Sequence, residues 1–135
     1  MKPVPVDKNS IILTDLNNIE QDFSKLLTIK DSITYINCSN INVNIETTIN
    51  KIILKKCNNI KLEVNKIISG IDIVNCKNIE FVTTKNKPIY NLYIENSENL
   101  NIKINKKNFK ETNIDICDCL DILFYDFNDK TILKL

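Results

Sequence analysis

Five cysteines are the residues of this sequence best suited to redox or metal chemistry. They stand at Cys38, Cys57, Cys76, Cys117 and Cys119. Their odd number argues against a closed set of disulfides, and no two of them form a C-x-x-C pair. A zinc site needs four converging ligands, and the chain has no histidine to contribute one. We therefore expect neither a metal nor another cofactor at these cysteines.

Acid-base chemistry has one candidate, the carboxylates Asp115, Asp118 and Asp121 near the C-terminus. Their spacing is compatible with Ca²⁺ binding or proton transfer, but a solvated polar edge of the last coil is the better interpretation, because solvated charges need no special explanation. The absence of histidine removes Ser-His and Cys-His dyads, and a single glycine leaves no phosphate-binding loop. We interpret the chain as a protein that is not an enzyme.

Net charge and the lengths of the apolar segments limit the classes of partner that the chain could bind. The 18 lysines and arginines nearly balance the 17 acidic residues, so the net charge is +1 and no global field favours nucleic acid or an anionic membrane. No segment has the apolar length of a signal peptide or of a membrane span. We expect a cytoplasmic protein that binds neither nucleic acid nor membrane.

An internal repeat becomes visible when the chain is aligned on its cysteines. The successive segments are LTDLNNIEQ, YINCSNINV, LKKCNNIKL, IVNCKNIEF, IENSENLNI and ICDCLDILF. Their anchor positions are Leu16, Cys38, Cys57, Cys76, Ser97 and Cys119, separated by 22, 19, 19, 21 and 22 residues. The sequence thus predicts about six coils of roughly 20 residues each.

Apolar residues alternate with polar ones on both sides of each anchor, which indicates two short strands joined at a corner. A further apolar position eight residues before the anchor, at Ile49, Ile68 or Ile89, suggests a third, shorter face. The prediction is an all-β fold, a right-handed parallel β-helix. Leucine-rich repeats share part of this spacing, but they usually turn into helix or loop after the corner, whereas this chain continues to alternate.

The corner predicts roles for two columns of residues. An anchor inside a tight corner must be small, and a free cysteine behaves as a small buried hydrophobe, which suits Cys38, Cys57, Cys76 and Cys119. Two residues later, asparagine recurs and can adopt left-handed backbone angles while bonding to the next coil. That column contains Asn18, Asn40, Asn59, Asn78 and Asn99, with Asp121 in the last coil. Cys117 breaks the alternation and points outward. It is either a reactive thiol or a partly exposed cysteine without a functional role.

The repeat also predicts which residues face outward. Before the anchor, the outward positions are unusually apolar for an exposed sheet and suggest a contact surface, unless a terminal segment covers it. Its proposed contact residues are Ile53, Lys55, Asp72, Val74, Tyr93 and Glu95. The face after the anchor is mostly polar, with Asn42, Asn44, Lys61, Glu63, Glu80 and Lys103. The turns between coils should stack lysines into a basic edge, at Lys66, Lys85, Lys87, Lys106, Lys107 and Lys110.

From about Lys30 to Asp126 the chain resembles the β-helical C-terminal domain of cyclase-associated proteins, of the superfamily shared with tubulin cofactor C. The resemblance is carried by the segments TINKIILKKCNNIKLEV and GIDIVNCKNIEFVTTKNKPIYNLYIENSENL. It implies a module that binds monomeric actin, promotes its nucleotide exchange, and forms a homodimer by exchanging C-terminal strands. We accordingly divide a single domain into an extension (1–10), the coils (11–126) and a C-terminal strand (127–135).

Two other functions stay open. A tubulin-cofactor-C-like module could bind tubulin or a small GTPase, but its relatives activate GTPases with an arginine finger, and this chain has no arginine. A structural or adaptor solenoid is the third possibility. Binding of purified protein to ADP-actin distinguishes these alternatives.

Overall fold

The computed structural model describes residues 4–7, 9–23, 27–83 and 87–135, which form two stacked sheets. Sheet A contains β1 (Val4–Asp7), β2 (Ser10–Thr14), β4 (Ser32–Ile36), β6 (Ile49–Lys55), β8 (Ile67–Val74), β10 (Asn91–Glu95) and β12 (Asn113–Cys117). Sheet B contains β3 (Asn17–Asp22), β5 (Ser39–Ile45), β7 (Asn58–Val64), β9 (Lys77–Thr83), β11 (Glu98–Lys103), β13 (Leu120–Tyr125) and β14 (Thr131–Lys134). One short helix, α1 (Lys106–Glu111), joins β11 to β12.

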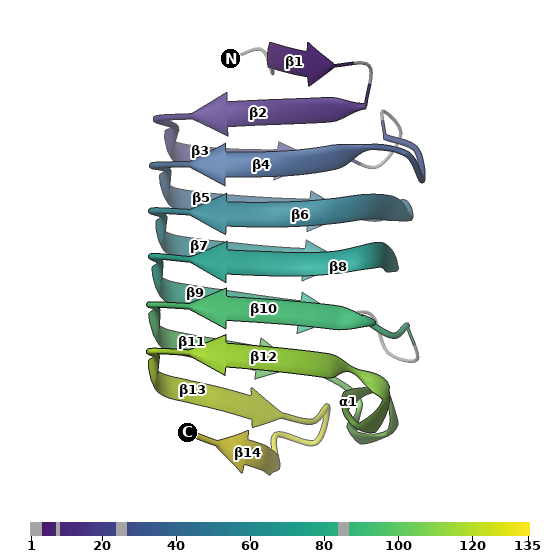
Figure 1. Ribbon diagram of the computed structural model, residues 1–135, viewed down its shortest axis with the longest axis vertical. Coiled ribbons are helices and arrows are strands. Elements are labelled where there is room, and N and C mark those ends of the chain that lie inside the picture. Colours follow the sequence, from purple (N-terminus) through teal and green to yellow (C-terminus); the bar gives the residue numbers. More distant parts are fainter. Residues whose placement is uncertain (1–3, 8, 24–26, 84–86) are drawn as a thin grey trace.

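The chain winds as a right-handed parallel β-helix, as the repeat predicts. Each coil runs along sheet A, turns at the anchor, returns along sheet B and steps to the next coil (Figure 1). Neighbouring coils pair in parallel in both sheets, from β2 through β12 and from β3 through β13. The second strand after every corner excludes the leucine-rich-repeat alternative.

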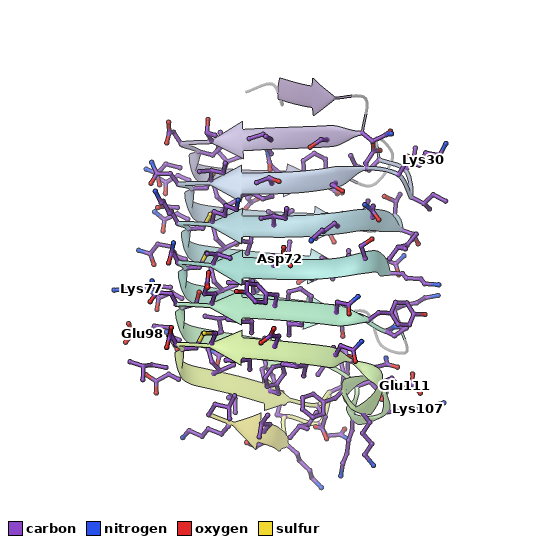
Figure 2. All side chains as sticks on the ribbon, in the orientation of Figure 1. Lys30, Asp72, Lys77, Glu98, Lys107 and Glu111 are labelled. Atoms are coloured by element: carbon purple, nitrogen blue, oxygen red, sulfur yellow. The ribbon has the colours of Figure 1, made fainter. Side chains whose placement is uncertain are left out.

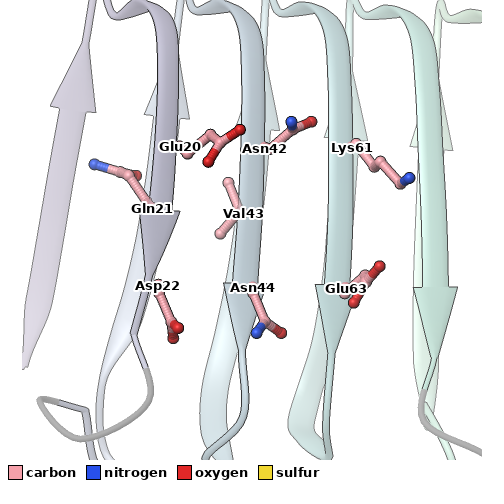
Figure 3. A pocket seen from close by; sticks show the side chains of 8 residues that line it. All are labelled: Glu20, Gln21, Asp22, Asn42, Val43, Asn44, Lys61 and Glu63. Atoms are coloured by element: carbon pink, nitrogen blue, oxygen red, sulfur yellow. The ribbon is translucent and has the colours of Figure 1, made fainter.

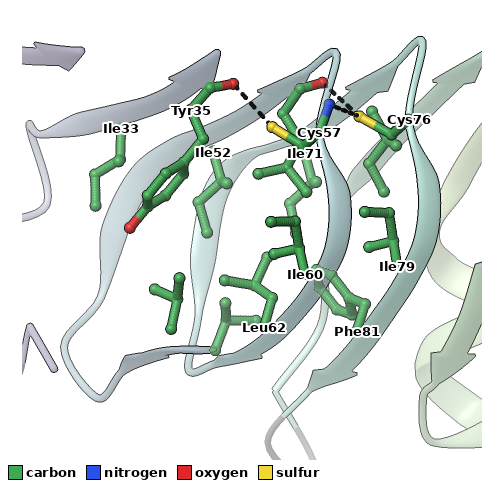
Figure 4. Packing of buried hydrophobic residues seen from close by; sticks show 14 of the residues in the cluster. Ile33, Tyr35, Ile52, Cys57, Ile60, Leu62, Ile71, Cys76, Ile79 and Phe81 are labelled. Carbon is green, nitrogen blue, oxygen red and sulfur yellow. Dashed lines mark hydrogen bonds between the residues drawn. The ribbon is translucent and has the colours of Figure 1, made fainter. Parts of the chain in front are cut away.

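The interior is filled by the alternating apolar residues of both sheets. Ile52 and Ile71 of sheet A and Ile60 and Ile79 of sheet B are all buried, each with at most 2% of its surface exposed (Figure 4). Burying each such side chain contributes about 1.5–3 kcal/mol. At the N-terminal end, the buried Tyr35 hydroxyl donates a hydrogen bond of 2.5 Å to Gln21 Oε1, which satisfies the one polar atom of that ring.

The anchor side chains are not only small but also form hydrogen bonds with the backbone. The Cys57 thiol donates to the carbonyl oxygen of Lys55, and the Ser97 hydroxyl donates to that of Glu95, at 3.3 and 2.9 Å. The same Ser97 oxygen accepts from the backbone N–H of Cys76 at 3.1 Å. Cysteine and serine both supply a small donor and acceptor, which explains why serine replaces cysteine in one coil. Cys38, Cys57 and Cys76 are buried, whereas Cys119 in the last coil is only half-buried.

Two residues of every corner adopt left-handed backbone angles, one more than the sequence analysis predicted. The predicted column is confirmed, with φ between 56° and 59° at Asn18, Asn40, Asn59, Asn78, Asn99 and Asp121. A second column stands directly before each anchor, with φ between 47° and 57° at Asp15, Asn37, Lys56, Asn75, Asn96 and Asp118. Asparagine and aspartate tolerate this region better than other side chains, so their enrichment has a structural cause.

Side-chain amides connect the corners of successive coils. Asn59 Nδ2 donates to Asn40 Oδ1, and Asn99 Nδ2 donates to Asn78 Oδ1, both at 2.6 Å. In the second column, Asn96 Nδ2 donates to Asn75 Oδ1 at the same distance. Stacked amides of this kind reinforce the backbone pairing between coils.

The predicted third face is absent from the described residues, and the assignment of Ile68 to the interior is wrong. Ile49 and Ile89 are buried as predicted, but in the coil between them Ile67 takes the interior position. The register of β6 and β8 shifts between Ile49 and Lys51, which turns Ile68 outward, 40% exposed. These residues lengthen the strands of sheet A instead of forming a third sheet.

The C-terminal end carries two features that the repeat does not predict. Helix α1 is capped by Asn105, whose Oδ1 accepts from the backbone N–H of Lys107 at 2.8 Å. Phe109 of this helix packs against Phe124, with ring centroids 5.2 Å apart. β14 folds back and pairs antiparallel with β13, so it covers the end of sheet B but not that of sheet A.

We predict that the corner asparagines stabilise the fold through both their backbone and their amide. Asn59→Ala should destabilise the protein more than Asn59→Gly, by roughly 1 kcal/mol, because alanine disfavours the left-handed angle that glycine adopts freely. Urea unfolding of both variants measures the difference. Glu63→Ala, at an exposed outward position of β7, serves as the control. Equal stability of the two Asn59 variants would contradict the backbone role.

Candidate functional site

The six predicted contact residues form one continuous patch on the outer face of sheet A. Parallel pairing aligns Ile53 with Asp72 and Asp72 with Tyr93 in one row. In the neighbouring row, Lys55 pairs with Val74 and Val74 with Glu95. We call these six residues the sheet A patch. The register therefore brings together side chains that are up to 42 residues apart in the sequence.

Neither terminal segment covers the sheet A patch within the part of the chain that the structure describes. β1 extends sheet A at its edge by pairing with β2, and β14 pairs with β13 of the other sheet (Figure 1). Lys55 is exposed, and the other five side chains are partly accessible. Tyr93 also borders a shallow hollow of about 320 Å³ that Asp115 lines from the next strand. The patch is thus available to a partner.

Charges within the patch are partly held in place by their neighbours. Lys51 Nζ lies 3.0 Å from Asp72 Oδ2, and both side chains are about one-third exposed, so the pair orients Asp72 more than it stabilises the fold. Figure 2 shows Asp72 on the middle strands of this face. A hydrogen bond with the Glu95 carboxylate raises the pKa of the Tyr93 phenol, so this ring remains a neutral donor at physiological pH. The patch combines apolar area with oriented polar groups.

The outer face of sheet B is less uniformly polar than predicted. Its N-terminal half contains a shallow hollow of about 500 Å³, whose charged lining residues are Glu20 and Asp22 of β3 and Lys61 and Glu63 of β7 (Figure 3). Its C-terminal part also presents Val82, Leu123 and Tyr125, which the sequence analysis missed. Lys103 Nζ lies 5.4 Å from the centre of the Tyr125 ring and 3.5 Å from Asp129 Oδ1. The C-terminal hairpin thereby shields part of this apolar area.

The side chains singled out for chemistry do not converge. Among the described residues, no three His, Cys, Asp or Glu side chains are grouped as metal ligands. Asp118 and Asp121 occupy the two left-handed corner positions of the last coil, whereas Asp115 points outward from sheet A. Burial raises the pKa of the Cys38 thiol, which keeps it protonated and unreactive. The side chains considered for metal or acid-base chemistry therefore lie apart from one another.

Cys117 is exposed, as the alternation predicts. Its thiol donates to Asp118 Oδ2 at 3.5 Å, and this contact raises the pKa of Cys117. A raised pKa leaves less thiolate at neutral pH, so the environment favours an exposed cysteine without a functional role over a reactive thiol.

The basic edge lies where the chain crosses from sheet B to sheet A, opposite the anchors. Lys87, Lys106, Lys107 and Lys110 are exposed there, and Lys66 is partly exposed. Lys85 lies outside the described residues. Figure 2 shows Lys30 and Lys107 on the same edge, whereas Lys77 and Glu98 mark the anchor corner.

Comparisons with known proteins agree on the architecture. The family model described as adenylate cyclase associated (CAP) C terminal matches residues 16–122. The chain is similar in structure to a cyclase-associated protein from Cryptosporidium parvum, with a TM-score of 0.81 and 22% sequence identity over 98% of this chain and 82% of that chain. No curated protein matches. Among the described residues, no helix has the length and apolar character to span a membrane.

We predict that the cysteines differ sharply in reactivity. Iodoacetamide at pH 8 should alkylate Cys117 first, Cys119 more slowly, and Cys38, Cys57 and Cys76 only after unfolding. Asp118→Asn should accelerate alkylation of Cys117 about threefold, because removing the carboxylate lowers the raised pKa and increases the thiolate fraction. Peptide mass spectrometry over time follows each site. Labelling of Cys57 in the folded protein at the rate of Cys117 would contradict the buried ladder.

Proposed function

Because the chain belongs to the family of C-terminal domains of adenylate cyclase-associated proteins, we propose that it is a non-catalytic module that binds monomeric actin and promotes actin nucleotide exchange. The observation that carries the assignment of the surface is the sheet A patch. Its six residues, predicted from outward positions alone, form two adjacent rows on a face that no described segment covers.

A sheet face of this kind suits protein recognition. Parallel pairing to both neighbours fixes the relative positions of Ile53, Asp72 and Tyr93, so little ordering is needed when a partner binds. Tyrosine contributes a large contact area with few rotatable bonds and is enriched among residues that dominate binding energy. Charged Lys55 and Glu95 at the margin of the patch suit steering and orientation more than affinity.

Nucleotide exchange requires no catalytic residue in this chain. A protein that binds more tightly to the actin conformations that release nucleotide shifts actin toward them and so accelerates release. This mechanism is compatible with the absence of histidine and arginine and with the lack of converging ligands among the described side chains.

The actin assignment predicts that Tyr93→Ala combined with Lys55→Glu weakens binding at least about tenfold without unfolding the protein, since the substitutions remove an aromatic contact and reverse a marginal charge. Fluorescence titration of labelled ADP-actin monomers measures the affinity, and circular dichroism checks the fold. Asn42→Ala combined with Lys61→Glu makes the matched change on sheet B and should leave affinity within about twofold.

Unchanged affinity of the Tyr93 and Lys55 double variant would contradict the surface assignment. If the unaltered protein neither binds ADP-actin nor changes its nucleotide release, the actin function itself is wrong. Tubulin and small GTPases, tested in the same titration, would then distinguish a cofactor-C-like module from an adaptor.

A homodimer formed through the C-terminal strand is the second part of the proposal. Among the described strands, β12 pairs with β10 alone, and Ile114 and Ile116 on it remain partly exposed, whereas the aligned Leu92 and Ile94 are buried. An unpaired strand with accessible apolar side chains is a template for another chain. Exchange of the segment from Phe127 to Leu135 would bring a second copy to this end.

Analytical ultracentrifugation tests the dimer across a range of micromolar concentrations. The unaltered chain should sediment at twice its monomer mass. Leu133→Asp should shift it to the monomer, because Leu133 pairs with the buried Phe124 and a carboxylate there is poorly tolerated. Lys134→Ala, at an exposed position of the same strand, is the control. A chain that is monomeric at every concentration would contradict the dimer.

A further inference from the structure

A second accessible surface lies on the edge opposite the anchors, separate from the sheet A patch. Ile68 and Tyr90 are 40% and 41% exposed, although both are large and apolar. The parallel bridge between Ile67 and Ile89 places their successors, Ile68 and Tyr90, side by side on adjacent coils. Single exposed hydrophobic residues are common, but a paired isoleucine and tyrosine indicate a contact surface.

The exposure of Ile68 has a specific backbone cause. Gly70 has a φ of +121°, and a Cβ at that position would lie 2.2 Å from the Asn91 carbonyl oxygen. The single glycine of the chain permits this close approach beside the register shift in β8, in which Ile67 and not Ile68 takes the interior position that Ile49 holds in the preceding coil. Ile68 is left on the outside.

Lysines outnumber acidic residues on this edge of the molecule. The described segments that cross from sheet B to sheet A contain Lys30, Lys66, Lys87, Lys106, Lys107 and Lys110, against Asp31, Glu46 and Glu111. Asp31 already accepts hydrogen bonds from Thr28, and Glu46 accepts one from Asn44. The salt bridges among the described residues involve Lys51, Lys77 and Lys103 and none of these edge lysines. The edge thus has an excess of unpaired positive charge.

A buried acceptor without a donor lies beside the same surface. Asn65 Oδ1 is inaccessible to solvent and has no hydrogen-bond partner, although its Nδ2 donates to the Glu46 carbonyl oxygen at 2.6 Å. Asn65 lines a hollow of about 360 Å³ together with Lys87, Glu63 and other residues. This acceptor is enclosed by the chain itself, so a partner can contact only the open part of the hollow, beside Lys87.

We propose that Lys66, Ile68, Lys87 and Tyr90 form a binding surface, here called the edge patch, for an acidic protein segment that carries apolar side chains. The apolar side chains of the partner cover Ile68 and Tyr90, and its carboxylates approach Lys66 and Lys87. A nucleic acid would use the lysines but leave the isoleucine exposed, so the apolar pair favours a protein segment. This proposal is independent of actin binding at the sheet A patch.

Fluorescence anisotropy with three labelled synthetic peptides tests the edge patch on the full chain. One peptide alternates Glu and Leu, one replaces every Glu with Lys, and one replaces every Leu with Ser. The Glu and Leu peptide should bind at least about tenfold more tightly than either of the others, because only it supplies both charge and apolar area.

Variants locate the binding. Ile68→Ser with Tyr90→Ser, and separately Lys66→Glu with Lys87→Glu, should each weaken binding of the Glu and Leu peptide about tenfold. Leu120→Ser, which removes a side chain that is 66% exposed at the anchor corner, and the Tyr93→Ala and Lys55→Glu double variant should change it less than twofold. Circular dichroism confirms that each variant is folded.

Several outcomes would overturn the edge patch. The first is that the Glu and Leu peptide does not bind. The second is that the edge variants bind this peptide as tightly as the unaltered chain does. The third is that the peptide lacking leucine binds as tightly as the Glu and Leu peptide. Tighter binding of a DNA duplex or of anionic vesicles with the same dependence on Ile68 and Tyr90 would replace the protein segment by another class of partner. Loss of actin binding in the Tyr93 and Lys55 variant affects none of these comparisons.

Discussion

The corner between the two sheets is the constraint on which the rest of this structure depends. In each coil a small anchor with a hydrogen-bonding side chain is flanked by two residues in the left-handed region, at positions such as Lys56 and Asn59 around Cys57. The backbone carbonyl oxygen of Cys57 accepts a hydrogen bond from the backbone N–H of Lys77 in the next coil at 3.0 Å. Because asparagine and aspartate adopt these angles at low cost and bond along the column, the same turn repeats and every coil stacks in register.

Register converts spacing in the sequence into position on a surface. Residues separated by one coil, such as Ile53 and Asp72, lie on adjacent strands, so a few outward positions per coil build a face that extends over several strands. The fold thereby presents a continuous outer face, and among the described residues no three His, Cys, Asp or Glu side chains are grouped as metal ligands. In the proposed function, the chain acts on an actin-bound nucleotide through a preference among actin conformations. The proposed edge patch would add a second site with different chemistry.

Much of this architecture was predictable because it is local and periodic. The alternation around Cys38, Cys57 and Cys76 defines the interior, and Asn40, Asn59 and Asn78 mark one of the two left-handed columns. The second column was missed because Lys56 interrupts its asparagines. Ile68 was misplaced because the irregularity near Gly70 depends on a close approach to Asn91 in the next coil, which no single-coil pattern reveals. Helix α1 interrupts the repeat for six residues, too few to show a helical period.

For the candidate site, the outward residues were predictable but their accessibility was not. Alternation identified Tyr93 and Val74, whereas the course of β1 and β14 depends on long-range pairing. Hydroxyl-radical footprinting of the protein with and without monomeric actin locates the contact surface, because Tyr93 and Tyr125 report on opposite faces in one experiment. Actin should suppress oxidation of Tyr93 and leave oxidation of Tyr125 unchanged. Protection of Tyr125 with Tyr93 unaffected would contradict this expectation.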